Sequence, residues 1–125
     1  MGTWVTFQWK EASLRILSPR ADLVIEEVKR LRGELDGYIA RHPAFQSSLE
    51  PVELLPGAPE ICRRMAAAAL PCGVGPMAAV AGAVAQACVE KALAAGADEA
   101  IVETGGDIFI ASPRPVTIGL YAGEH

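Results

Sequence analysis

Two different spacings of hydrophobic residues divide the first forty positions into a hairpin and a helix. Bulky residues alternate through Trp4–Trp9 and again through Ser13–Leu17, and this period of two predicts two strands joined by a turn at residues 10–12. Ser18 and Pro19 then favour the start of a helix that ends before Pro43. The helix carries a single apolar stripe that consists of Val24, Val28, Leu31, Leu35 and Ile39.

Prolines and small residues organise the middle of the chain. Residues 43–59 hold four prolines and are predicted to be a connection, and Glu60–Ala69 is predicted to be a short helix. Pro76 favours the start of a longer helix that runs through Ala95. Its residues are mostly small and apolar, so we expect it to be buried on most sides and to be the most buried helix of the chain. Gln86 and Glu90 interrupt the apolar run, and we therefore expect no membrane span.

Three more strands are predicted after this helix, at Ala100–Glu103, Ile108–Ile110 and Val116–Tyr121. The predicted order is therefore β-β-α-α-α-β-β-β. Runs of strands separated by a block of helices indicate an α+β fold in which helices cover one face of an antiparallel sheet. A chain of 125 residues fits one domain.

Charge is distributed unevenly along the chain. Residues 1–64 hold nine basic and nine acidic side chains, whereas residues 65–125 hold two basic and six acidic ones and carry the whole formal charge of −4. A nucleic-acid groove needs clustered Lys and Arg to neutralise phosphates, so we expect no nucleic-acid partner. Alanine supplies 15 of the residues between positions 66 and 100, which indicates a core of small side chains.

The cysteines are too widely spaced for a typical zinc site. Cys62, Cys72 and Cys88 form no CxxC pair, and His42 and His125 are the only histidines of the sequence. We expect buried or half-buried thiols in a reducing compartment. The first residues also lack the pattern of a signal peptide, so we expect a cytoplasmic protein without a membrane partner.

The segment Gly73-Val74-Gly75-Pro76-Met77-Ala78 is the first candidate for chemistry. It satisfies GxGxxA, but a predicted helix precedes it where a dinucleotide-binding fold would have a strand. Glycines before a helix expose backbone N–H groups and the positive end of the helix dipole, which suit a phosphate or carboxylate. The alternative is a tight corner between two helices, in which glycine only supplies the backbone conformation.

A second glycine pair, Thr104-Gly105-Gly106-Asp107, follows a predicted strand. The glycines would let a flat ligand approach the main chain, and Asp107 could accept a hydrogen bond or help to bind a cation. The alternative is an ordinary Gly-Gly hairpin turn. We hypothesise that this turn and the Gly73–Met77 loop flank one pocket at an end of the sheet.

Together the two motifs resemble a known family. Gly73–Ala85 followed by Val102–Ile108 is similar to the uncharacterised branch of the ApbE superfamily, whose better-known members are FAD:protein FMN transferases, formerly called thiamine biosynthesis lipoproteins. The similarity extends upstream through Tyr38–Phe45 and Ser48–Pro51, and downstream through Ile118–Gly123. It therefore covers nearly all of the chain.

The resemblance implies a fold, a ligand and a partner. The fold would be the tunnelling-fold-like ApbE architecture, and residues 1–125 would form the N-terminal half of a longer protein whose C-terminal half, or a second copy of the chain, is the partner. The ligand would be FAD or FMN with Mg²⁺, or another nucleotide-like anionic small molecule. The implied cofactor-binding residues are Gly73, Gly75, Pro76, Met77, Thr104, Gly105, Gly106 and Asp107, and the implied metal contacts are the backbone carbonyl of Ala81 and Asp107.

We therefore expect a protein that binds a flavin nucleotide or a related anionic ligand, without identified catalytic residues. If it is an enzyme, Mg²⁺ would polarise the pyrophosphate of FAD so that FMN passes to a Ser or Thr acceptor. The alternative is a non-catalytic accessory or structural module, for example in sulfur-compound assimilation.

Overall fold

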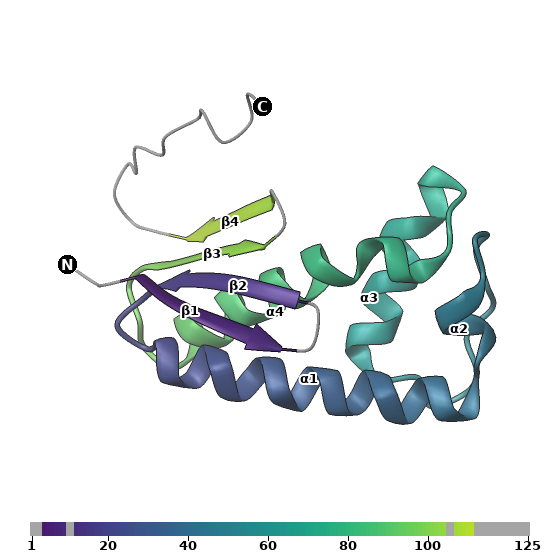
Figure 1. Cartoon of the computed structure of the whole chain (residues 1–125), viewed down its shortest axis with the longest axis horizontal. Coiled ribbons are helices and arrows are strands. Elements are labelled where there is room, and N and C mark those ends of the chain that lie inside the picture. The colour runs from purple at the N-terminus through teal and green to yellow at the C-terminus, as the bar shows by residue number, and fades with distance from the viewer. Residues whose placement is uncertain (1–3, 10–11, 105–106, 112–125) are drawn as a thin grey trace. The chain divides into compact units, whose positions relative to one another are not determined.

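The computed structural model describes residues 4–9, 12–104 and 107–111, and within them it confirms the predicted α+β class (Figure 1). The chain divides into two compact units, residues 1–26 with 85–125 and residues 27–84, and each is described by itself. The elements are β1 (Trp4–Trp9), β2 (Ala12–Leu17), α1 (Ala21–Arg41), α2 (Ala44–Ser47), α3 (Glu60–Ala69), two 3₁₀ helices (Leu70–Cys72 and Pro76–Ala79), α4 (Val80–Ala94), β3 (Ala100–Thr104) and β4 (Asp107–Ala111).

The first unit contains a four-stranded antiparallel sheet in the order β1-β2-β3-β4. Paired residues point to the same face, and the row formed by Val5, Ile16 and Val102 is the covered one, because Ile16 and Val102 are fully buried. The predicted N-terminal hairpin is confirmed. The predicted strand at Val116–Tyr121 lies outside the described residues, and the finer ApbE-like architecture is not confirmed.

Ser18 acts differently from the predicted helix cap. The helix α1 begins at Ala21 instead of at Pro19, and its first carbonyl acceptor belongs to Arg20. The Ser18 hydroxyl accepts a hydrogen bond from the Arg20 N–H (3.2 Å) and donates one to the carbonyl of Glu99 (3.0 Å). Ser18 therefore fixes the end of the β1–β2 hairpin to the start of β3, a long-range role that the local cap signal did not reveal.

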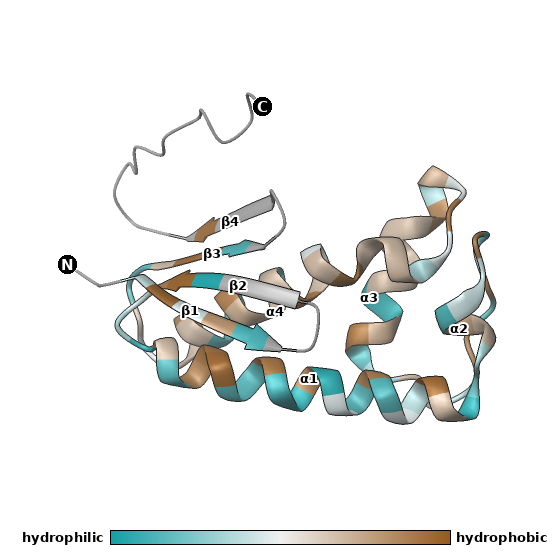
Figure 2. Cartoon of the chain, in the orientation of Figure 1, coloured by the Kyte–Doolittle hydropathy of each residue, from teal (hydrophilic) through white to brown (hydrophobic). Residues whose placement is uncertain are grey.

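The apolar stripe of α1 is confirmed for four of its five predicted residues. Val24, Val28, Leu31 and Leu35 are buried, and brown and teal stretches alternate along α1 in Figure 2. The last position of the stripe is wrong, because Tyr38 is buried and Ile39 is only half-buried. An α-helix has 3.6 residues per turn, so residues 38 and 39 both lie about one turn after Leu35. Either position can therefore continue the stripe.

In the second unit, an aromatic cluster fixes the proline-rich connection. The rings of Tyr38 and Phe45 meet edge to face with centroids 5.0 Å apart, and His42 lies 5.7 Å from Tyr38. The hydroxyl of Tyr38 accepts a hydrogen bond from the Leu55 N–H (2.8 Å), and His42 Nε2 lies 3.0 Å from the carbonyl oxygen of Glu53. Residues 43–55 are therefore fastened to the end of α1, and α2 is a helical turn within a segment that we predicted to be irregular.

The helix that follows Pro76 differs from its prediction in two ways. Its first turn, Pro76–Ala79, is a 3₁₀ helix that continues into α4. It is also not buried on most sides: a stripe that includes Ala85, Cys88 and Ala92 is buried, whereas Gln86 and other residues between these positions are exposed. By length and composition alone, Pro76–Ala94 could cross a membrane, a test that the core helix of a soluble protein also passes.

We expect Tyr38→Phe to lower the free energy of unfolding by about 0.5–1.5 kcal/mol, because it removes the acceptor of the half-buried Leu55 N–H while the ring packing is kept. Urea titration followed by circular dichroism measures this change. A Tyr38→Phe protein as stable as the wild type would show that the hydroxyl does not fasten the connection.

Candidate functional site

The loop between α3 and α4 holds the first group of predicted site residues, and its glycines have different roles. Gly73 ends the 3₁₀ helix Leu70–Cys72 with a φ of 69°, in the left-handed region that favours glycine. Its N–H donates to the carbonyl of Leu70 (3.0 Å), and a Cβ at this position would meet no atom within 4 Å. Gly73 is therefore required by its backbone conformation and not by lack of space.

Gly75 is required because another part of the main chain approaches it. A Cβ built on Gly75 would lie 1.9 Å from the carbonyl oxygen of Ser48 and 2.8 Å from its carbonyl carbon. The backbone of Gly75 is extended (φ −70°, ψ 157°), a conformation that any residue adopts, so only the contact explains the glycine. Gly75 and Pro76 are both buried. The loop is thus packed against the Ser48 segment and is held in one position.

Ser48 is a residue whose role the sequence did not reveal. Its hydroxyl donates to the carbonyl of Glu50 (2.7 Å) and accepts from the Glu50 N–H (3.1 Å), which makes a tight local turn. This turn fixes the carbonyl that faces Gly75. The available signal was the absence of a side chain at position 75, but nothing in the sequence identifies the segment that fills the space.

The first turns of the helix after Gly75 contain no acidic residue. Gly75 also offers no capping side chain. Ala78 is exposed and Met77 is half-buried. An uncapped helix start carries a partial positive charge, so this position suits an anion physically.

The second predicted motif lies at the end of the β3–β4 hairpin. Thr104 and Asp107 are paired across the two strands, which is the backbone pairing that a two-residue hairpin loop requires. This pairing favours the hairpin alternative for the motif. Gly105 and Gly106 lie outside the described residues, as do the side chains of Thr104 and Asp107. The hypothesis that this turn and the Gly73–Met77 loop flank one pocket therefore stays a prediction.

The predicted metal contact at Ala81 lies in the first turn of α4, where a regular helix directs its carbonyl to the N–H of residue 85. This position favours an ordinary helical role for the carbonyl over metal binding. Among the residues that the structure describes, no three His, Cys, Asp or Glu side chains gather as metal ligands. The binding of Mg²⁺ stays a prediction without support from these residues.

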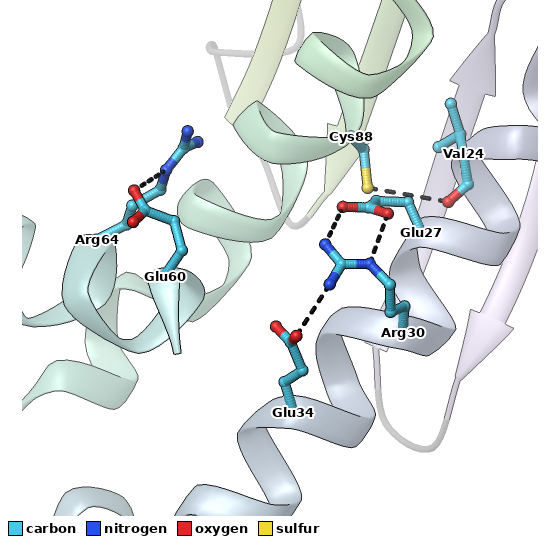
Figure 3. Close-up of polar contacts among 7 residues, drawn as sticks. All are labelled: Val24, Glu27, Arg30, Glu34, Glu60, Arg64 and Cys88. Atoms are coloured by element: carbon cyan, nitrogen blue, oxygen red, sulfur yellow. Dashed lines mark hydrogen bonds and ion pairs between the residues drawn. The ribbon is translucent and has the colours of Figure 1, made fainter. Parts of the chain in front are cut away.

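A ladder of charged side chains runs along α1 in the second unit (Figure 3). Arg30 forms two hydrogen bonds to the carboxylate of Glu27 (3.0 and 2.7 Å) and a third to Glu34 (2.9 Å). The hydrogen bond to Glu27, whose side chain is only 8% exposed, raises the pKa of Arg30 above its ordinary value. Since every charge in the ladder has an opposite partner, it stabilises the buried carboxylate and offers no ready general acid or base.

The three thiols occupy different environments. Cys62 and Cys88 are buried as expected, whereas Cys72 is exposed, which corrects the prediction that all three are covered. The Cys88 thiol lies 3.9 Å from the carbonyl of Val24, as a weak donor (Figure 3). Burial raises the pKa of the Cys62 thiol from 9.0 to about 11, with Glu34 adding to the rise and Arg41 opposing it. Cys62 is therefore a packed, unreactive thiol.

We expect Gly75→Ala to lower the free energy of unfolding by at least about 1–3 kcal/mol, because the new methyl group displaces a backbone carbonyl that cannot rotate away. The matched control is Gly33→Ala in α1, where a Cβ meets nothing within 4 Å and alanine is expected to add about 0.5–1 kcal/mol. Thermal unfolding of both variants measures the contrast, and equal effects would contradict the close approach at Gly75.

The raised pKa of Cys62 makes stability depend on alkaline pH. Between pH 9 and about 11 the unfolded thiol loses its proton while the folded thiol keeps it, so the contribution is complete below pH 9 and is lost as the pH rises through this range. We expect urea unfolding of the wild type to weaken over this range more than that of Cys62→Ala. Parallel pH curves for the two proteins would show that Cys62 ionises normally in the folded state.

Three archaeal proteins that are similar in sequence to this chain carry the same name, UPF0280 protein. The chain is 46% identical over 120 residues to a UPF0280 protein of Methanocella arvoryzae, 47% identical over 122 residues to one of Methanospirillum hungatei and 45% identical over 121 residues to one of Archaeoglobus fulgidus. Each match covers 94% of this chain and 49%, 49% and 51% of the respective relative. The chain thus spans about half the length of the curated relatives it matches.

These comparisons correct the predicted family and the function terms attached to it. None of these relatives carries the name of an ApbE protein, a flavin protein or an FMN transferase, so the prediction of an ApbE-superfamily protein is wrong. The motifs that suggested it lie within the matched region, and they mark a different family. A family model described as "AbpE bacteria" matches residues 3–125, and the chain belongs to that family.

Proposed function

We propose that the protein binds a small anionic molecule, such as one bearing a phosphate or carboxylate group, at the start of the helix Pro76–Ala94. The observation that supports this function best is the uncapped helix start: the first turn is free of acidic residues, and the loop before it is fixed against Ser48. A rigid, uncompensated helix start attracts an anion through its N–H groups and its dipole.

The chemistry of the loop favours recognition through the main chain. Gly75 and Pro76 are buried, so the ligand would approach from the side of Met77 and Ala78, which reach the surface. Gly75 provides no side-chain cap that would compete with a ligand at this turn. Pro76 has no N–H, and the Ala78 N–H donates to the carbonyl of Gly75 (3.2 Å), so the ligand would be recognised through the Met77 N–H and the helix dipole. The binding energy from main-chain donors alone is modest, so we expect weak affinity in this chain unless further residues of a longer protein contribute.

A structural module is the second candidate, and the burial of Gly75 favours it. In that case the two glycines serve only to bring the Ser48 segment and the α3–α4 corner together, and the helix start binds no ligand. The two candidates make the same prediction for stability and opposite predictions for ligand binding.

We expect Ala78→Asp to abolish binding of inorganic pyrophosphate, because a carboxylate at the exposed helix start repels the ligand and competes for the same N–H groups. The matched control is Ala78→Asn, which has a similar size and no charge and is expected to weaken binding far less. Isothermal titration calorimetry measures both.

The stability of the same variants provides an internal check. Aspartate in a first turn stabilises a helix by about 0.3–1 kcal/mol, so Ala78→Asp is expected to bind less while unfolding at a slightly higher temperature. Wild-type protein that shows no heat of binding at millimolar pyrophosphate would contradict the proposed function and favour the structural module.

A further inference from the structure

One face of the sheet carries a continuous row of apolar residues across all four strands. The register pairs Trp4 with Leu17, Leu17 with Ile101, and Ile101 with Ile110, so these four residues point to the same side. Ile101 is buried at the centre of the row, Leu17 is half-buried, and the outer members Trp4 and Ile110 are 41% and 42% exposed. Large apolar side chains thus remain in contact with solvent at both ends of the row.

The neighbouring row on this face contains an ion pair whose charges are balanced. Arg15 donates a hydrogen bond to Glu103 (2.8 Å), and its guanidinium carbon lies 4.7 Å from the ring centroid of Trp4. The two charges cancel each other, and the remaining described residues of the row are neutral. Among the described residues of these two rows, the Arg15 cation is paired with Glu103, so they favour an apolar polypeptide surface with a polar rim over phosphates.

The relatives supply a candidate for that polypeptide. The chain corresponds to 49% of the Methanocella arvoryzae protein and 51% of the Archaeoglobus fulgidus protein, so about half of each relative has no counterpart here. A sheet is stable when both its apolar surfaces are covered by another layer, and the Val5–Ile16–Val102 face is already the covered one.

We infer that the sheet face formed by Trp4, Leu17, Ile101 and Ile110, bordered by the Arg15–Glu103 ion pair, is the docking surface for the polypeptide that makes up the rest of these relatives. The contact would bury the exposed parts of Trp4 and Ile110 and would leave the ion pair at its rim. This inference is independent of the anion site, because it rests on the sheet and on the length of the relatives.

Co-expression tests this inference directly. The tagged 125-residue chain is produced together with the part of the Methanocella arvoryzae protein that it does not match, as two separate polypeptides, and the amount of the second polypeptide retained on the tag is measured. We expect retention by the wild type and a loss of at least about tenfold with Ile110→Lys, which replaces an exposed apolar side chain of the contact with a charge.

The matched control is Leu70→Lys, since Leu70 is also a large exposed apolar residue (63%) but belongs to the unit of residues 27–84. It is expected to retain the second polypeptide as the wild type does, and circular dichroism confirms that both variants fold. No retention by the wild type, or equal retention by Ile110→Lys, would overturn the inference. Sedimentation that shows a dimer of the chain alone, broken by Ile110→Lys, would also overturn it in favour of a second copy.

Discussion

The close approach of the Ser48 carbonyl to the backbone of Gly75 is the constraint on which the arrangement of residues 27–84 depends. A Cβ at position 75 would lie 1.9 Å from that oxygen, so only glycine allows the contact. The carbonyl is fixed by the turn at Ser48, and the turn follows a segment fastened by Tyr38 and Phe45 to the end of α1. A chain of short contacts therefore determines where the helix after Pro76 begins.

Local pattern predicted those elements whose stability comes from an apolar face. Hydrophobic periods of two or 3.6 residues can be recognised within a single element. They predicted the hairpin β1–β2, the stripe of α1, the helix α3 and the hairpin β3–β4. The features that differed depend on distant partners. Tyr38 takes the last core position because its hydroxyl meets the Leu55 N–H, and Ser18 bonds to Glu99 across 81 positions of the sequence.

The candidate site could be located from sequence but not interpreted. In the first motif, Gly73 is needed for its positive φ, whereas Gly75 is needed because the Ser48 carbonyl leaves no space for a side chain. The sequence shows glycine at both positions and does not distinguish the two reasons. Likewise the Thr104–Asp107 pairing is what an ordinary hairpin needs. Motif resemblance recovered a region that relatives share and assigned it to the wrong family, because glycine-rich turns before small-residue helices specify geometry more than chemistry.

Binding of an anion at the helix start Gly75–Ala78 can be followed residue by residue. The backbone amide resonances are assigned and followed by NMR while inorganic pyrophosphate is added to the 125-residue chain. We expect saturable shifts centred on the amides of Met77 and Ala78, with little change along α1. Shifts confined to surface Lys and Arg residues, or none at the helix start, would contradict this binding.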